Sequence, residues 1–496
     1  MPTAAKPAET PKPPAASQPD EPPTVMKHTV KMGNRSINYT TTTGFMPIKN
    51  RDGETEAKIF FMAYTLDDAP NKANRPLMFS FNGGPGSASV WLHLGALGPK
   101  RVKMLDDGFM PPPPYKLENN ESSWLPETDL VFIDPVGTGY SRAMKQELNQ
   151  KFFSVNGDIE SVGEFIRMYL SRNERWNSPL FLVGESYGTT RASGLSDHLF
   201  ERGIAFNGIL LVSSVMNFQT LRFAEGNDLP FVLIFPSYVS TAWYHKKLSA
   251  EYQQKPLRDV LNEAENFASN GLTLALAKGD KMDAGERQAA VAKFAQLTGL
   301  SQNFVSNSNL RIELSRFNKE LMRDTRRTTG RLDSRFTGVD GDVSGESPGF
   351  DPSLTAIRPP YTSTFNDYVR SELGHKSDSD YYILGGGVSN WNWNTNNGYA
   401  NTSVALREAM QKNPYMKVFI ASGYYDMATP YFATEYTIAN MNLEPNLRRN
   451  ITFDYYEAGH MMYIERNSLR KLKEDVTDFI GNSIKANASN PTVKPN

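Results

Sequence analysis

The chain has 496 residues, a formal net charge of −1 and no cysteine. A chain of this length can bury a large core and form two or three domains. Its balanced charge gives no electrostatic sign of a nucleic-acid partner, and the lack of cysteine excludes disulfide bonds, thiolate metal sites and cysteine catalysis. The sequence contains no apolar run long enough to span a bilayer.

Residues 1–27 alternate proline with alanine and a few charged residues, a composition that forms neither helix nor strand. We predict a disordered tail or an extended tether here. The segment lacks the apolar stretch of a signal peptide, so either the signal has been removed from the sequence or the protein is cytoplasmic. Because such a tail often follows a cleavage site in exported proteins, we expect a secreted or periplasmic protein.

From His28 the chain alternates apolar and polar residues as antiparallel strands do, over 28–32, 37–42 and 57–64. Shorter and more continuously apolar runs follow, which suit parallel strands buried on both faces: 77–81, 130–133, 180–183, 209–212 and 418–421. Helical stretches separate several of these runs. We therefore expect an α/β fold with a mixed, mostly parallel central sheet and helices on both faces.

Residues 217–385 differ from their surroundings because they are rich in helical and charged stretches. We predict an inserted helical cap there, which divides the main domain into a first part, 28–216, and a second part, 386–496. Many arginines fall within 310–335, where we expect a solvated helix face.

The sequence Gly184-Glu-Ser-Tyr-Gly188 lies between an apolar strand and the helical stretch 189–200. A serine between two glycines in a strand-to-helix turn is the setting of a nucleophile elbow, whose tight turn exposes the serine hydroxyl. A glycine-rich surface turn is the alternative, since the five-residue pattern also arises by chance. The flanking strand and helix favour Ser186 as a nucleophile.

A hydroxyl nucleophile needs a general base. Of the six histidines, His460 lies on the loop after the last predicted strand, 451–456, and a helix follows that loop. This is where an α/β fold of this kind carries its base, and a structural loop histidine is the alternative. His93, near a glycine-rich loop, is the one rival.

The base in turn needs an acid that orients it, and Asp426 is the best candidate because it follows a buried strand. Asp454 lies inside a strand and Asp134 precedes the nucleophile, so both are poorer candidates. The chain order Ser186, Asp426, His460 is that of α/β-hydrolases. The sequence thus predicts a Ser-His-Asp triad on an α/β-hydrolase fold.

Residues 81–87, Phe-Asn-Gly-Gly-Pro-Gly-Ser, form a glycine-rich loop after a strand. Such a loop can present a backbone N–H group to an oxyanion. No Gly-Lys-Ser/Thr follows and the sequence carries no dinucleotide fingerprint, so we do not expect a phosphate site. The predicted chemistry needs neither a metal nor an organic cofactor.

Together these motifs resemble the serine carboxypeptidase family, of the carboxypeptidase Y-like type. The matching motifs occur in the family's order: Asn82-Gly-Gly-Pro-Gly86 with Leu97-Gly-Pro99, Asp134-Pro-Val-Gly-Thr-Gly-Tyr-Ser141, Gly184-Glu-Ser-Tyr-Gly188 and Gly459-His-Met461. They cover roughly residues 60–215 and 385–485, and the chain is similar to a bacterial-type member without disulfides.

The resemblance implies an oxyanion hole formed by the N–H groups of Gly84 and Tyr187. It also implies that Asn82, Gly83 and Glu185 bind the C-terminal carboxylate of a substrate. Two carboxyl groups in contact cannot both be ionised, so Glu185 must carry a proton to donate a hydrogen bond. We therefore expect peptide cleavage to be fastest below about pH 6. A purely local hydrogen-bonding role is the alternative for Glu185.

Two positions depart from the family pattern: Ser80 stands where a tryptophan is usual, and Ala96 stands where a second glutamate is usual. We expect a serine-type carboxypeptidase that acts on peptides with a free C-terminal carboxylate through an acyl-enzyme. These departures keep an esterase or acyltransferase open as the alternative, and a non-catalytic binding protein is a third. The oligomeric state is open, a homodimer included.

Overall fold

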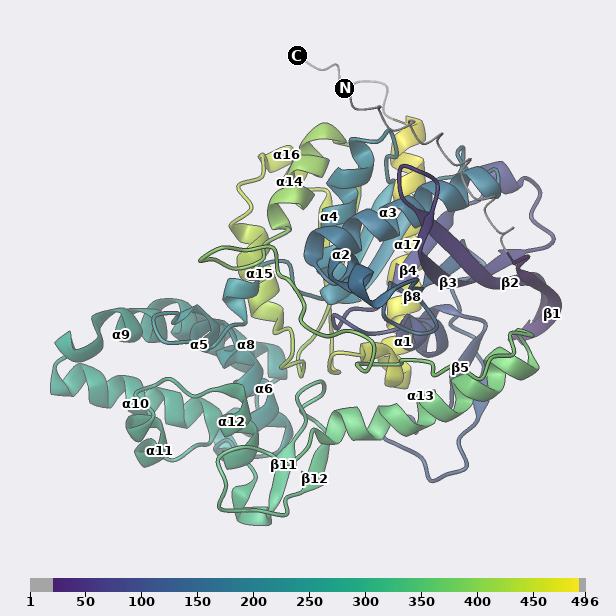
Figure 1. Cartoon of the computed structure of the whole chain (residues 1–496). Helices are drawn as coiled ribbons and strands as arrows, with labels where there is room; N and C mark the ends of the chain where they lie inside the picture. The colour runs from purple at the N-terminus through teal and green to yellow at the C-terminus, as the bar shows by residue number, and fades with distance from the viewer. Residues whose placement is uncertain (1–20, 490–496) are drawn as a thin grey trace, which may run out of the picture.

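A ten-stranded sheet forms the centre of the computed structural model, which describes residues 21–489 (Figure 1). The strand order is β1-β2-β3-β7-β4-β9-β10-β13-β14, with β8 paired to β3. The strands are β1 (Thr24–Met32), β2 (Arg35–Lys49), β3 (Thr55–Leu66), β4 (Leu77–Phe81), β7 (Asp129–Ile133), β8 (Arg142–Ala143), β9 (Leu180–Ser186), β10 (Gly208–Ser214), β13 (Lys417–Gly423) and β14 (Ile451–Tyr456).

The first three strands pair antiparallel, and β3 also pairs antiparallel with β7. From β7 through β4, β9, β10 and β13 to β14, every neighbouring pair is parallel. Parallel strands carry their following loops at the same edge of a sheet, so the loops after β4, β9, β13 and β14 meet there. The mixed, mostly parallel sheet expected from the sequence is confirmed.

The predicted tail, 1–27, is too long. Residues 24–27 belong to β1, where they pair with 43–40 of β2. The last proline of the tail is Pro23, so the residues that follow can donate to the ladder and extend the strand. Residues 1–20 lie outside the described part of the chain.

Helices cover both faces of the sheet (Figure 1). Successive strand residues point to opposite faces, so Phe132 and Val183 enter one buried cluster while Val131 and Leu182 enter the other. The first cluster includes side chains from α1 (Val90–Leu92), α13 (Pro352–Ser371) and α17 (Arg466–Ser489). The second includes side chains from α2 (Asn149–Phe152), α3 (Val155–Arg172), α4 (Tyr187–Phe200) and α14 (Ser403–Lys412).

A helical lobe projects from one side of the sheet domain and has its own buried core (Figure 1). Its helices are α5 (Leu229–Leu233), α6 (Phe235–Tyr244), α7 (Ala250–Gln253), α8 (Leu257–Asn266), α9 (Thr273–Lys278), α10 (Ala284–Thr298), α11 (Gln302–Asn307) and α12 (Leu314–Glu320). This lobe is the helical part of the insertion predicted at 217–385.

Within the predicted insertion, the buried residues of the lobe's core end at Leu321, well before residue 385, and Tyr425, Met427, Tyr431 and Ala433 of the second part of the main domain complete it. Helix α13 packs Tyr361, Phe365 and Tyr368 into the core of the sheet domain instead. Two short hairpins, β5 (Lys100–Val102) with β6 (Leu117–Asn119) and β11 (Arg327–Thr329) with β12 (Thr337–Val339), lie outside the main sheet. Two further helices, α15 (Tyr431–Ala439) and α16 (Pro445–Arg448), precede β14.

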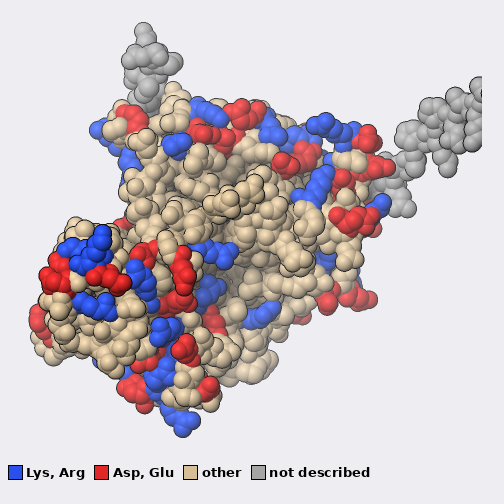
Figure 2. Space-filling model, turned by 60° about the vertical axis from the view of Figure 1, so that its left-hand side comes forward, with Lys and Arg blue, Asp and Glu red and all other residues tan. Residues whose placement is uncertain are grey.

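Charged side chains of both signs are interspersed over the lobe and the rim of the face in Figure 2, as the near-zero net charge leads one to expect. Uncharged surface occupies much of the centre of that face. Within residues 21–489, no helix has the length and apolar character needed to cross a membrane.

Candidate active site

Ser186 ends β9, and the next residue begins α4. Its backbone has φ 60° and ψ −131°, a strained conformation for a residue with a side chain. A Cβ atom on Gly184 would lie 2.2 Å from the carbonyl oxygen of Gly188, so the chain can close this turn only with glycine. This is the geometry of a nucleophile elbow.

His460 and Asp426 are joined by a hydrogen bond of 2.7 Å between Nδ1 and Oδ2. Asp426 is fully buried, and its Oδ1 accepts the N–H groups of Ala428 (2.8 Å) and Thr429 (2.9 Å). The Thr429 hydroxyl donates to Oδ2 at 2.6 Å. An aspartate fixed in this way holds the proton of the imidazole on Nδ1, which leaves Nε2 free to accept one.

The backbone of the loop around His460 is held from two sides. The His460 N–H donates to the carbonyl oxygen of Leu332 at 2.6 Å, and the Ser213 hydroxyl donates to the His460 carbonyl oxygen at 2.6 Å. The Gly459 N–H donates to Asp333 Oδ2 at 3.0 Å. The predicted base, His460, is therefore positioned both by the sheet domain and by the insertion, which supplies Leu332 and Asp333.

Arg335 forms a buried ion pair with Asp333, with Nη2 2.6 Å from Oδ2. The expectation of a solvated helix face for the arginines of 310–335 is therefore wrong for this residue. The segment that carries it is a loop packed on the histidine loop: a Cβ atom on Gly459 would lie 2.4 Å from Asp333 Cβ. Close packing against the sheet domain removes the guanidinium from water, and the carboxylate compensates its charge.

Burial alone lowers the pKa of His460, because it disfavours the charged imidazolium. The negative charge and hydrogen bond of Asp426, together with the nearby Glu185, outweigh burial and raise the pKa above 6.5. The protonation states of His460 and Glu185 are thus coupled, so that ionised Glu185 favours the protonated histidine.

Glu185 precedes the elbow serine and is 3% exposed. Burial raises the pKa of its carboxyl group to about 7, while His460 and the hydrogen-bonding neighbours Tyr463 and Asn82 counteract only part of this shift. The Tyr463 hydroxyl donates to Oε2 at 2.5 Å. At neutral pH, a large fraction of the protein therefore holds Glu185 as the neutral acid.

Asn82 lies beside this carboxyl group with its amide oxygen occupied, since Oδ1 accepts the Leu92 N–H at 3.1 Å. Its amide nitrogen is buried and makes no well-oriented hydrogen bond within the described residues. A buried donor of this kind is costly unless a ligand accepts from it. The structure therefore brings the predicted carboxylate-binding pair, Asn82 and Glu185, together. The Asn82 amide nitrogen and the protonated Glu185 carboxyl are both able to donate a hydrogen bond to a ligand.

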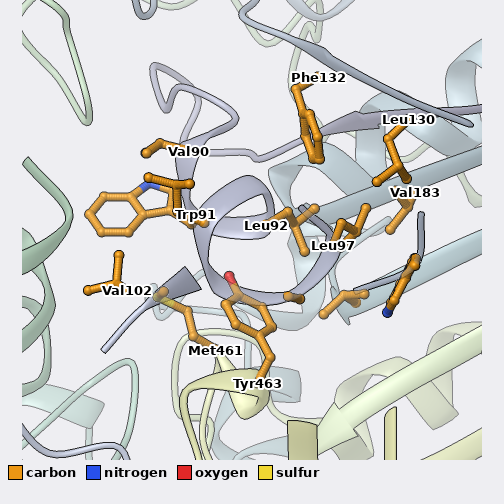
Figure 3. Packing of buried hydrophobic residues seen from close by; sticks show 14 of the residues in the cluster. Val90, Trp91, Leu92, Leu97, Val102, Leu130, Phe132, Val183, Met461 and Tyr463 are labelled. Atoms are coloured by element: carbon orange, nitrogen blue, oxygen red, sulfur yellow. The ribbon is translucent and has the colours of Figure 1, made fainter. Parts of the chain in front are cut away.

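Tyr463 was not among the predicted site residues. It comes from the loop after His460 and points towards the helical turns that carry Trp91, Leu92 and Leu97 (Figure 3). Its ring lies so close to Gly95 that a Cβ atom there would be 2.4 Å from Cε2. The next residue, Ala96, is fully buried and stands where the family pattern has a glutamate. Close to this position, Tyr463 supplies a hydrogen-bond donor to Glu185.

The glycine-rich loop after β4 lies directly against the start of α4. A Cβ atom on Gly83 would be 2.4 Å from the backbone nitrogen of Tyr187 and 2.7 Å from that of Gly188. Gly84 has φ 101°, which a residue with a side chain rarely adopts. The two segments that carry the predicted oxyanion donors, Gly84 and Tyr187, therefore meet beside the elbow.

The rival residues serve the structure elsewhere. His93 stacks on Phe132 at 4.3 Å between ring centroids and its Nε2 lies 2.6 Å from the Tyr64 hydroxyl, while burial lowers its pKa to about 3. Asp134 accepts the N–H and hydroxyl of Ser89. Asp454 pairs with a surface lysine. None of these interactions involves Ser186 or its loop.

A cleft of about 610 Å³ opens where the insertion faces the sheet domain, and it reaches Gly84 on one side and Met427–Ala428, next to Asp426, on the other. Its walls are largely aromatic and aliphatic and include Phe218, Leu221, Phe223, Phe350 and Trp393, with four charged residues, Arg222, Glu313, Arg331 and Asp351. Over residues 21–489, the structure brings together no group of three or more His, Asp or Glu side chains able to hold a metal ion.

The family model for serine carboxypeptidases matches residues 32–472 of the chain. The chain belongs to the serine carboxypeptidase family. The family predicted from the four motifs is thereby confirmed.

Two curated relatives match a shorter stretch of the chain. Serine carboxypeptidase-like 5 from Arabidopsis thaliana is 30% identical over 155 residues, which cover 31% of this chain and 33% of the relative. The pheromone-processing carboxypeptidase Kex1 from Saccharomyces cerevisiae is 33% identical over 155 residues, which cover 29% of this chain and 20% of the relative. These matches span a third or less of the length of the relatives.

Among solved structures, the chain is similar to a crystal structure of the prohormone-processing carboxypeptidase Kex1 from S. cerevisiae. The TM-score is 0.53 and the identity 18%, with 89% of this chain and 91% of that chain covered. At this identity the similarity shows the fold, which confirms the predicted fold class.

Proposed function

We propose that the protein is a serine-type carboxypeptidase that releases C-terminal residues from peptides. Family membership supports the reaction class. The observation that carries the finer assignment is the buried Glu185 carboxyl with a pKa raised to about 7, which lies beside the buried amide nitrogen of Asn82 and next to the elbow serine. An endopeptidase or simple esterase has no need for such a pair.

In the proposed reaction the Ser186 hydroxyl attacks the carbonyl carbon of the last peptide bond. His460 accepts the hydroxyl proton at Nε2 and donates it to the nitrogen of the departing residue. Asp426 keeps the imidazole in the required tautomer and stabilises its positive charge, as the 2.7 Å hydrogen bond supports. Water, activated by the same histidine, then hydrolyses the acyl-enzyme.

The N–H groups of Gly84 and Tyr187 stabilise the oxyanion of each tetrahedral intermediate. The close contact between the glycine-rich loop and the first turn of α4 supports this assignment. Backbone donors held rigidly in a site sheltered from water need no reorganisation during the reaction, which is why such donors lower the barrier.

The C-terminal carboxylate of the substrate accepts hydrogen bonds from the Asn82 amide, from the backbone at Gly83 and from the protonated Glu185. Tyr463 supports this arrangement because it donates to Oε2 and so directs the acidic proton to the other oxygen. When Glu185 ionises, it repels the substrate carboxylate, so binding weakens as the pH rises.

The cleft at Gly84 binds the acyl side of the substrate, the residue that stays on Ser186 after the first step. Its aromatic and aliphatic walls suit a large apolar side chain at that position. Peptides are thus the proposed partners, and a secreted or periplasmic location stays a prediction from the N-terminal composition.

The experiment that tests this function compares an N-blocked dipeptide with a free C-terminus, its C-terminal amide and a simple aryl ester, with wild type and Ser186→Ala. Preference for the free acid over the amide, lost with the serine, supports a carboxypeptidase. Cleavage of the ester alone, also lost with the serine, contradicts it and supports the esterase or acyltransferase alternative, which the missing partners at Ser80 and Ala96 keep open.

A further inference from the structure

Arg191 is a buried cation behind the elbow, 1% exposed, and the mechanism above gives it no role. It lies on α4 one helical turn after Tyr187, so both residues face the same side of the helix. A buried guanidinium must have its charge compensated and its donors satisfied, and where those donors point shows what it holds in place.

One group of contacts reaches the glycine-rich loop. Nη1 donates to the carbonyl oxygen of Asn82 at 2.7 Å, immediately before Gly83 and Gly84. The guanidinium carbon also lies 5.0 Å from the centroid of the Phe81 ring, at the end of β4. Arg191 therefore binds the segment that carries one predicted oxyanion donor.

The other contacts reach the elbow and the helix beside it. The guanidinium carbon lies 5.3 Å from the centroid of the Tyr187 ring, which also packs against Trp391 and Trp393. Nε donates to Asp158 Oδ2 at 2.8 Å, and this carboxylate, on α3, is itself 3% exposed. The side chain is thus clamped against the residue that carries the second donor.

We propose that Arg191 is a positioning residue that sets the distance between the two oxyanion donors, Gly84 and Tyr187. Its single rigid group joins both segments, and Asp158 fixes its orientation. The end of β4 and the start of α4 also pack directly on each other, since a Cβ atom on Gly188 would lie 2.9 Å from the Phe81 carbonyl oxygen. A small displacement of Arg191 would therefore be transmitted to both segments. The inference rests on the proposed function, since it concerns the same reaction.

The test uses Arg191→Lys and Asp158→Asn. Lysine keeps the charge but has one donor atom, which cannot reach Asp158 and the Asn82 carbonyl with the fork geometry of arginine. Asparagine keeps the size of Asp158 and removes the charge that orients the guanidinium. We expect kcat for an aryl ester to fall about 10- to 100-fold in both variants, because misplaced oxyanion donors act on the transition state, while KM changes less than about threefold.

A peptide boronic acid provides the second readout, because its adduct with Ser186 places an oxygen in the oxyanion hole. Its affinity should fall in parallel with kcat. The matched control is Arg175→Lys, which alters another buried arginine–aspartate pair, Arg175 Nη1 to Asp129 Oδ2 at 2.6 Å, at the opposite end of the strands. We expect the control to lose stability and keep kcat.

Unchanged kcat and boronate affinity in Asp158→Asn, or an equal kcat loss in the Arg175→Lys control, would overturn the proposal. If Arg191→Lys does not fold, Asp158→Asn still decides the question through the same two readouts. Failure of the proposed function looks different: wild type would then still cleave the aryl ester but would show no preference for the free-acid dipeptide over its amide.

Discussion

Replacing Glu185 by glutamine tests whether a protonated carboxyl group recognises the substrate's C-terminus. The Gln amide can accept the Tyr463 hydrogen bond at its oxygen and donate towards the substrate from its nitrogen, at any pH. The variant therefore mimics the protonated enzyme permanently. It also removes a negative charge that raises the pKa of His460.

The size of the effect follows from the raised pKa of about 7. In wild type the protonated fraction of Glu185 is about 0.99 at pH 5 and about 0.09 at pH 8, so preference for the free acid over its amide should fall about tenfold between these pH values. In Glu185→Gln this preference should stay constant. The acid limb of ester hydrolysis, which reports His460, should move to lower pH in the variant.

The assay is kcat/KM from pH 5 to pH 8 for a blocked dipeptide, its C-terminal amide and an aryl ester. Using the acid-to-amide ratio removes the titration of His460, which both substrates share. Glu435→Gln is the matched control, because Glu435 is a half-buried glutamate that also accepts from a tyrosine, Tyr455, and has a raised pKa. We expect this control to follow wild type.

A wild-type acid-to-amide ratio that does not change with pH would refute the reasoning. So would a tenfold decline that persists in Glu185→Gln, because the titrating group would then be another residue.

Four further predictions concern Tyr463, the binding cleft, the Asp333–Arg335 ion pair and the pH dependence of stability. Tyr463→Phe removes a hydrogen bond that lowers the pKa of Glu185, so the alkaline decline of free-acid hydrolysis should move to higher pH; an unchanged profile would contradict this. Phe350→Ala should raise KM about tenfold for substrates with a large apolar acyl-side residue and leave alanine substrates nearly unchanged, whereas equal effects on both would place Phe350 outside the binding cleft. Asp333→Ala leaves the buried Arg335 unpaired and should cost about 3–5 kcal/mol in urea unfolding, together with activity; a cost below about 1 kcal/mol would show that the pair is dispensable. The folded-state pKa of Glu185 is raised from 4.5 to about 7, so the free energy of unfolding of wild type should fall as the pH rises between these values. Glu185→Gln should unfold with a free energy roughly 3 kcal/mol higher than wild type at pH 8, and equal to it below pH 4.5.

Most of the fold could be predicted from the sequence because its signals are local. The buried strands are continuous apolar runs, and the elbow needs glycine at Gly184 for a contact within its own turn. The Asp426 and His460 positions follow from which loops come after parallel strands. The predicted tail, 1–27, overlapped the first residues of β1, which begins at Thr24, because the tail was continued beyond Pro23, its last proline.

The supporting contacts could not be predicted because they join residues far apart in the chain. Tyr463 and Glu185 are separated by 278 positions, and nothing in either local sequence marks the pair. Arg191 lies close to the elbow in sequence, but its partner atom, the Asn82 carbonyl oxygen, belongs to another loop. The end of the insertion could not be predicted either, because the spacing of apolar residues in α13 does not show whether the helix packs on the lobe or on the sheet domain.

The hydrogen bonds that the histidine loop donates to Leu332 and Asp333 bear on how members of this family can be recombined. An insertion that only covered a site could be exchanged between relatives to transfer substrate preference. Here the same segment also holds the loop of the proposed general base, His460, so a chimera that replaces the whole insertion should lose turnover rather than change selectivity. Grafts that keep residues 331–335 and exchange only the helical lobe from α5 to α12 are the ones in which catalysis and selectivity can be separated.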